Sequence, residues 1–213
     1  MPDMNKLEIN GVIYDVRDPT KAPAGYGLGG QGTLITDCNI THSGFYKFDD
    51  GTWNRPFDYG TLIVSGRHDG NCNQIAICHD GTDKGCIAVR QYGANLDDGW
   101  EFLNPRMTLN TEYRTTERYN GKPVYVKLVN CGYLPESPGT KQVVFLPNGN
   151  AQDIVRHSAE VRTDDGTQVF SLPYTLNNIN WCVQAIGKNA INLYVSYSAS
   201  GYAAYVTVWY TKA

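Results

Sequence analysis

Eight Asx-Gly dipeptides are spread along the chain, and they constrain its fold more than any other feature. Asn, Asp and Gly tolerate positive φ, which a type I′ hairpin turn requires at its two central positions. Short alternating or continuous apolar runs lie between the dipeptides, and no segment has a sustained helical period. The sequence therefore predicts an all-β protein with at most a short helical turn. The clearest predicted strands are Thr61–Val64, Cys86–Val89, Val124–Val129 and Tyr205–Tyr210.

The sequence argues against two classes of protein, nucleic-acid-binding proteins and membrane-spanning proteins. A chain of 213 residues is long enough for one large β domain or two small ones with a real core. Its net charge is −3 and its 18 Lys and Arg residues are scattered, whereas nucleic-acid binding needs a basic stripe that displaces counterions. We therefore expect no nucleic-acid partner. No apolar run of about 18 residues exists, so we expect no membrane insertion.

The N-terminal sequence has neither the basic start nor the apolar stretch of a signal peptide. We expect the protein to fold in the reducing cytoplasm of a bacterial host, with any outside role reached by lysis or as part of a particle. Its six cysteines should then be mostly free thiols.

Turn signals and composition predict four segments. The first contains one small hairpin, Lys6–Ile9 turning at Asn10-Gly11 into Val12–Val16. An isolated two-stranded hairpin is marginal in water, so it should pack on something larger or on copies of itself. The polar hinge is interrupted by Gly121 and Pro123. The segments are a hairpin connector (1–22), a small β module (23–110), the hinge (111–123) and a second β module (124–213).

Several fragments resemble tail fibres of phages, prophages and pyocins. Residues 101–130, which include Tyr113-Arg114-Thr115 and the run from Glu117 to Tyr125, are similar to the junction between the knob module and the C-terminal module in tail fibres from phages and prophages of Gram-positive bacteria. The run Ala22–Gly29 resembles the start of the pyocin knob, and Ala203–Lys212 resembles the closing strand of the matching C-terminal module. The resemblance implies a short N-terminal hairpin, a small β knob and a C-terminal antiparallel β-sandwich, assembled as a homotrimeric fibre tip.

Three paired carboxylates raise the question of glycosidase chemistry: Asp49-Asp50, Asp97-Asp98 and Asp164-Asp165. Each pair is followed by Gly, and neighbours on a turn do not face each other across a sugar. No G-x-S-x-G elbow, phosphate loop or H-E-x-x-H motif is present. We therefore expect no enzyme activity.

A group of cysteines and histidines is the weak alternative for a metal site, with His68, Cys72, Cys78, His79 and Cys86 as zinc ligands. The spacings lack the tight C-x2-C knuckle, and Cys78 alternates with Ala76 as a buried residue on a strand would. We expect buried thiols, no metal and no cofactor.

Aromatic residues among polar neighbours are the better functional candidates. Sugar binding commonly stacks a pyranose on Tyr or Trp, while Asn fixes the hydroxyl groups. Tyr174 and Tyr202 are expected to be exposed, Trp181 is balanced between core and surface, and Trp209 is expected in the core. The ligand-binding candidates are Tyr174, Asn177, Asn178, Trp181 and Tyr202.

Three further aromatic residues, Trp53, Tyr92 and Trp100, lie beside turns of the first module. We expect them to cap its small core, with ligand contact as the alternative.

The sequence leads to one functional hypothesis. It is a non-enzymatic receptor-binding protein at the virion tail tip, which attaches the particle to a bacterial cell-surface polysaccharide or other host receptor through its C-terminal module. The expected partners are two further copies of the chain and an upstream tail or baseplate protein. Three linked weak sites would raise affinity through avidity. The alternatives are a structural trimerisation or adaptor module of a tail or contractile injection particle, and a glycan depolymerase.

Overall fold

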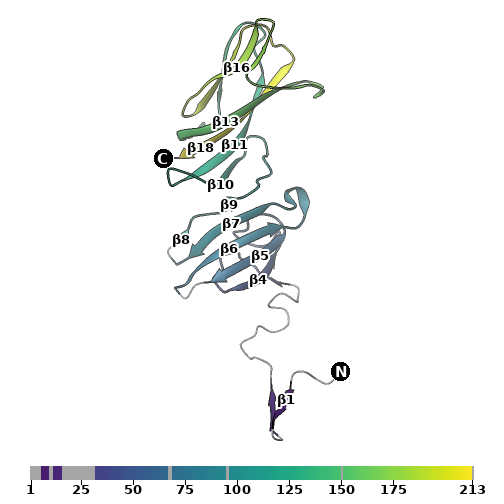
Figure 1. The fold of residues 1–213 in the computed structure, drawn as a ribbon, viewed down its shortest axis with the longest axis vertical. Helices are drawn as coiled ribbons and strands as arrows, with labels where there is room; N and C mark the ends of the chain where they lie inside the picture. Colours follow the sequence, from purple (N-terminus) through teal and green to yellow (C-terminus); the bar gives the residue numbers. More distant parts are fainter. Residues whose placement is uncertain are drawn as a thin grey trace. The chain divides into compact units, whose positions relative to one another are not determined.

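The computed structural model describes residues 6–9, 12–15, 32–66, 69–94, 96–149 and 151–212 (Figure 1). The ordered elements are strands, apart from one short 3-10 turn at Gly81–Asp83 in this part of the chain. The predicted all-β class is confirmed. Two compact units are present: unit 1 comprises Met1–Gly85 and Arg90–Gly99, and unit 2 comprises Cys86–Val89 and Trp100–Ala213. Across the described residues, none of the helical structure has the length and apolarity needed to cross a membrane.

The N-terminal hairpin is present as predicted. Strand β1 (Lys6–Ile9) pairs antiparallel with β2 (Val12–Asp15), with Ile9 opposite Val12. The turn residues Asn10 and Gly11, and the predicted lead-in at residues 22–30, lie outside the described residues.

The strands of unit 1 have the order β3-β4-β5-β6-β7, and β8 pairs with β7; of β7, only Arg90–Gly93 belongs to this unit. Alternation along β6 points Cys72, Gln74, Ala76 and Cys78 to the buried face, because successive side chains of a strand point to opposite sides. The strands are β3 (Thr33–Leu34), β4 (Gly44–Phe48), β5 (Gly60–Gly66), β6 (Asn71–Cys78), β7 (Ile87–Gly93) and β8 (Leu96–Asp97).

A buried polar network ties a loop of unit 1 to this sheet. Arg90 donates from Nε to Gln74 Oε1 (2.7 Å) and from Nη2 to the Cys38 carbonyl oxygen (2.9 Å). Gln74 Nε2 donates to the carbonyl oxygens of Cys38 (2.9 Å) and Ile40 (2.7 Å). The loop therefore has fixed partners for its carbonyls, as buried backbone groups require.

Unit 2 is a β-sandwich. One sheet has the order β14-β13-β18-β11-β10-β9, and the other has the order β12-β17-β16-β15. All pairs are antiparallel except β9 with β10. The strands are β9 (Glu101–Phe102), β10 (Glu112–Tyr119), β11 (Lys122–Tyr133), β12 (Gly139–Val144), β13 (Ala151–Thr163), β14 (Val169–Ser171), β15 (Tyr174–Leu176), β16 (Ile179–Ile186), β17 (Ala190–Val195) and β18 (Tyr202–Lys212).

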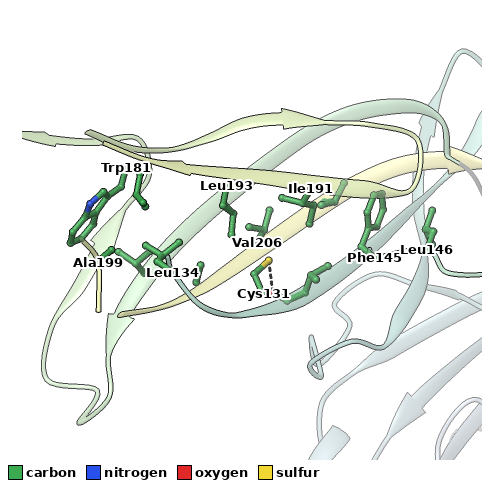
Figure 2. Packing of buried hydrophobic residues seen from close by; sticks show 14 of the residues in the cluster. Cys131, Leu134, Phe145, Leu146, Trp181, Ile191, Leu193, Ala199 and Val206 are labelled. Carbon is green, nitrogen blue, oxygen red and sulfur yellow. Dashed lines mark hydrogen bonds between the residues drawn. The ribbon is translucent and has the colours of Figure 1, made fainter. Parts of the chain in front are cut away.

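The core of unit 2 lies between these two sheets (Figure 2). Ile191 and Leu193 of β17 face Val206 of β18, and all three are fully buried. Trp181 lies at one end of this row of side chains, and Phe145 lies towards the other end. The predicted C-terminal sandwich is therefore confirmed, with aromatic side chains towards both ends of its core.

The register of β18 corrects one prediction. Val206, Val208 and Tyr210 alternate into the core, so Trp209 points to the opposite face of the sheet. There it is half-buried, and the Arg156 guanidinium lies over its ring at 4.6 Å. The expectation that Trp209 is a core residue is wrong, because the alternation of β18 places the adjacent Tyr210 in the core.

The range 111–123, expected to be a hinge, has regular structure. Most of it is β10, which pairs with β11 through a turn at Asn120-Gly121. The φ angles of 49° and 77° at these residues are those that a type I′ turn needs. Residues 116–119 form the exposed part of this strand, and the last boundary between the units lies at Gly99 and Trp100.

Candidate functional site

Four aromatic rings pack together at one end of the unit 2 core. Tyr174 lies 5.3 Å from Trp181 and 5.0 Å from Phe170, measured between ring centroids. Tyr202 lies 4.8 Å from Trp181 and 6.0 Å from Phe170. The four contacts form a closed cycle, hereafter the aromatic cluster. Its residues come from β14, β15, β16 and β18, so the cluster joins both sheets.

The members of the cluster differ in exposure. Trp181 is only 5% exposed and belongs to the core, so its ring offers no free face for a ligand. Tyr174 and Tyr202 are half-buried, each with part of its ring accessible. Of the predicted aromatic residues, the structure thus brings three together, with Trp181 as the support and the two tyrosines at the surface.

The Trp181 indole also has an unusual feature. Its Nε1 atom is buried and has no hydrogen-bond partner. The indole N–H is a donor only, and such groups usually find an acceptor when buried. Trp181 is therefore held by ring packing and not by a polar anchor.

Asn177 and Asn178 form the exposed tip beside the cluster, at the turn between β15 and β16. Their φ angles are 47° and 67°, the left-handed values of a tight hairpin turn. Ser196 stabilises the tip: its Oγ donates to the Asn178 carbonyl oxygen (3.3 Å) and accepts from the Asn180 amide (2.7 Å). The main chain of the tip is therefore fixed, and both asparagine side chains are exposed.

Tyr197 is a site residue that the sequence reasoning did not single out. It is 62% exposed and follows Ser196, which is bonded to the asparagine tip. The available signal was its setting in the polar run Tyr197–Gly201, between two strands. Tyr197 is thus an exposed ring that follows the residue holding the asparagine tip.

The aromatic candidates of the first module have different settings. Trp53 is 74% exposed, so the expectation that it caps a core is wrong. Tyr92 is half-buried, with the Arg90 guanidinium 4.8 Å from its ring centroid. Trp100 is half-buried and belongs to unit 2.

The cysteines and histidines proposed as zinc ligands have other partners. Cys72 and Cys78 are buried, and their thiols donate to the carbonyl oxygens of Ile40 (3.4 Å) and Asp80 (3.2 Å). His79 Nε2 lies 2.8 Å from the Thr61 hydroxyl. Cys86 is buried, and His68 lies outside the described residues. The described residues include no group of three or more His, Cys, Asp or Glu side chains placed to hold a metal ion.

The paired aspartates close turns, as predicted. Asp49 Oδ1 accepts from the Gly51 amide (3.1 Å), and Asp97 Oδ1 accepts from the Gly99 amide (3.4 Å). Asp165 Oδ1 accepts from the Thr163 hydroxyl (2.6 Å) and from the amide and hydroxyl of Thr167. These hydrogen bonds lower the pKa of Asp165 to about 2.

Fold and site together define a two-unit all-β protein with an aromatic cluster at one end of its sandwich. No family model matches this chain, and neither does any curated protein. Among solved structures, the chain is similar to the C-terminal fragment of the R1 pyocin fibre of P. aeruginosa. The match has 13% identity and a TM-score of 0.27, and covers 84% of this chain and 66% of the fragment.

Two R2-type pyocin fibres are also similar. An N-truncated R2-type pyocin tail fibre has 11% identity and a TM-score of 0.28, with 84% of this chain and 94% of the fibre fragment covered. A C-terminal fragment of the P. aeruginosa R2 pyocin fibre has 9% identity and a TM-score of 0.27, over 84% of this chain and 65% of the fragment. Likeness at this level does not extend to side chains, so any ligand of this chain has to be inferred from its own residues.

Proposed function

We propose that this chain is a non-enzymatic receptor-binding protein of a tail fibre, which attaches the particle to a bacterial cell-surface polysaccharide through unit 2. The observation that carries this proposal is the placement of Tyr174 and Tyr202 against Trp181, beside an exposed turn of two asparagines. Aromatic rings offer an apolar face to a pyranose, and amide groups pair with its hydroxyls.

Rigidity favours this use of the rings. Each tyrosine packs against Trp181, and a buried core fixes Trp181 in turn. A ring already ordered in the free protein loses little conformational entropy when a ligand stacks on it. The Ser196 bonds have the same effect on the asparagine tip. The site thus resembles preorganised binding surfaces, in which affinity depends on rigid aromatic residues.

Assembly completes the proposal. Three copies of the chain would present three such sites, and linked sites raise the apparent affinity without any new contact. A single site can then be as weak as about 1 mM. We place the protein at the virion tail tip, joined to an upstream tail or baseplate protein and synthesised in the host cytoplasm. A solution mass by light scattering near three times that of one chain is expected, and a monomer would contradict the avidity argument.

The asparagine tip provides the sharpest test. Asn177→Gly and Asn178→Gly remove the amide side chains but keep residues that tolerate positive φ, so the turn is preserved. We expect the double variant to bind host cell-wall polysaccharide about tenfold more weakly, as the loss of one or two hydrogen bonds implies. Tyr174→Ala and Tyr202→Ala should weaken binding further.

Tyr119→Ala is the matched control. Tyr119 is exposed and pairs with Lys122 where β10 turns into β11, the end of β11 that pairs with Tyr210. Tyr202 is at the other end of β18. Unchanged binding in the tip and tyrosine variants would overturn the proposal. New reducing ends released from the polysaccharide would favour a depolymerase, and absence of binding to any host cell would favour a structural adaptor.

A further inference from the structure

Unit 1 presents an exposed tryptophan that the aromatic cluster of unit 2 does not explain. Trp53 is 74% exposed, more than any other large hydrophobic side chain in the described part of the chain. An exposed indole leaves a large apolar area in water, and tryptophan at such positions is typical of contact sites. The residues around Trp53 indicate which kind of ligand its ring would contact.

The main chain at Trp53 is tightly held. The Trp53 amide donates to the Thr36 carbonyl oxygen (2.9 Å), and the Trp53 carbonyl oxygen accepts from the Cys38 amide (2.9 Å). Cys38 is itself held from the sheet by Arg90 and Gln74. Thr52, directly before Trp53, is fully buried and donates from Oγ1 to the Ile35 carbonyl oxygen (2.8 Å). The exposed ring therefore stands on a rigid base.

A polar recess begins at the next residue. Asn54 has a φ of 57°, and its Nδ2 donates to Asp37 Oδ1 (2.9 Å), which orients the chain that follows. The recess has a volume of about 350 Å³. Its lining consists of Asn54, Arg55, Pro56, Phe57, Asp58 and Asp83.

Arg55 supplies the positive charge of this recess. Its Nη1 donates to the Thr52 carbonyl oxygen (2.7 Å), and its Nη2 lies 3.3 Å from Asp58 Oδ1. The Nε atom is buried and has no hydrogen-bond partner, so a ligand does not reach it. Each Nη group carries two N–H bonds, so the guanidinium keeps donors beyond these two contacts.

We propose that unit 1 carries a second binding site, formed by the Trp53 ring and the recess from Asn54 to Asp58 with Asp83, and that its ligand is a neutral saccharide. A pyranose offers a flat C–H face for the indole and hydroxyl groups that accept and donate hydrogen bonds. One hydroxyl can accept from an Nη group of Arg55, and others can donate to the carboxylates of Asp58 and Asp83.

The negative charge around the recess favours neutral over anionic glycans. Asp58 and Asp83 line the recess and Asp37 lies beside Asn54, against the single guanidinium of Arg55. A phosphate-bearing or carboxylate-bearing glycan would be repelled from this surface. An apolar protein partner would bury these carboxylates without donors, which is costly. The hydroxyl groups of a sugar can donate hydrogen bonds to these carboxylates.

Nuclear magnetic resonance of the full chain tests the site directly. The chain has 4 tryptophans and therefore four indole N–H signals, and Trp53→Ala identifies the Trp53 signal by its loss. The probes are trimers of β-1,4-linked N-acetylglucosamine and of α-1,4-linked glucose, each raised to about 10 mM because single sugar sites bind near 1 mM. Glycerol 3-phosphate is the anionic comparison.

At least one trisaccharide should shift the Trp53 signal, and glycerol 3-phosphate should not. Arg55→Lys replaces the forked guanidinium by a single ammonium group and should weaken the binding about fivefold, the effect of one lost hydrogen bond. Lys84→Gln, an exposed change outside the recess lining, should have no effect. The shift should persist in the Asn177→Gly/Asn178→Gly variant, which separates this site from the one in unit 2.

Three results would overturn the proposal. One is the absence of a Trp53 shift with both trisaccharides, and another is a shift with glycerol 3-phosphate alone. The third is a lower solution mass of the Trp53→Ala variant, which would make the ring a contact between copies of the chain.

Discussion

The Trp181 and Tyr202 rings lie 4.8 Å apart, centroid to centroid, and they come from opposite sheets of the unit 2 sandwich. Trp181 is on β16 in the four-stranded sheet, and Tyr202 begins β18 in the other. Their contact therefore closes one end of the core and at the same time places a tyrosine at the surface. Stability and ligand binding depend on the same pair, and suitable variants can separate them.

Trp181→Ala should destabilise unit 2 by about 3–5 kcal/mol, because it leaves a large cavity between Tyr174 and Tyr202. Trp181→Phe should cost less, about 1–2 kcal/mol, since the indole Nε1 has no hydrogen bond to lose. Guanidinium unfolding followed by circular dichroism measures both changes. A Trp181→Ala variant as stable as the parent would show that the cluster is not part of the core.

Arg90→Met should destabilise unit 1 by about 3 kcal/mol. The change removes the donors to Gln74 Oε1 and the Cys38 carbonyl oxygen and leaves those buried acceptors short of partners. Amide hydrogen exchange in β5 and β6 reports the loss for this unit separately. Lys84→Met, at an exposed position of the same unit, should change stability by less than about 0.5 kcal/mol.

Arg90 also affects the position of Trp53. The Cys38 main chain accepts from Arg90 and donates to the Trp53 carbonyl oxygen. The Arg90→Met variant should therefore shift the Trp53 indole signal in the absence of any ligand. An unmoved Trp53 signal together with slower exchange in β6 would contradict this description of the network.

The Asp165 carboxyl should titrate with a pKa of about 2, because the Thr163 hydroxyl and two groups of Thr167 donate to it. Thr163→Val removes one donor and should raise this pKa toward the ordinary value near 4. Carbon-13 detected titration of the carboxyl measures it. Thr116→Val, on the exposed part of β10, should leave the Asp165 pKa unchanged.

The same carboxyl links stability to pH. A group whose pKa is lower in the folded state stabilises the protein above its unfolded pKa of about 4, and the contribution is lost as the pH falls towards 2. Thr163→Val should therefore be less stable than the parent at pH 7, with a smaller difference at pH 3. A difference that grows on acidification would contradict this assignment.

One cysteine should react quickly with a disulfide reagent at pH 8. All six cysteines are free, and all are buried except Cys182, which is half-buried on β16. Burial raises the pKa of Cys38 and Cys131 to about 11, so roughly a thousandth of either is thiolate at this pH. Cys182→Ser should abolish the fast phase. Rapid labelling of Cys38 in the folded protein would contradict the packing of unit 1.

Local chemistry was enough to predict the class of fold and several of the strands. Residue types that tolerate positive φ predicted the turn at Asn120-Gly121, and alternating apolar runs predicted β5, β11 and β18. Turns and strands depend on neighbours in the chain, so their signals are local. The aspartate turns at Asp49, Asp97 and Asp165 were predictable for the same reason.

Side-chain placement depended on contacts between distant strands. Trp209 and Tyr210 are adjacent and similar in apolarity, and the pairing of β18 with β11 and β13 determines which of them is buried. The burial of Trp53 and Trp181 also depends on tertiary contacts. Trp53 is exposed, whereas Trp181 lies in the core. No local signal distinguishes these outcomes, because burial depends on which face of a strand meets the second sheet.

The candidate site depends partly on local sequence and partly on tertiary structure. Its residue types, tyrosines beside an Asn-Asn turn, were visible in the sequence of residues 172–181 and 197–202. Tertiary structure alone brought Tyr174 and Tyr202 onto the two sides of Trp181, across 28 positions of sequence and from different sheets. The sequence by itself determined the strands, the turns and the chemical character of the loops. Packing of the two sheets decided which aromatic rings support the core and which remain accessible, since a side chain is buried only when another surface covers it.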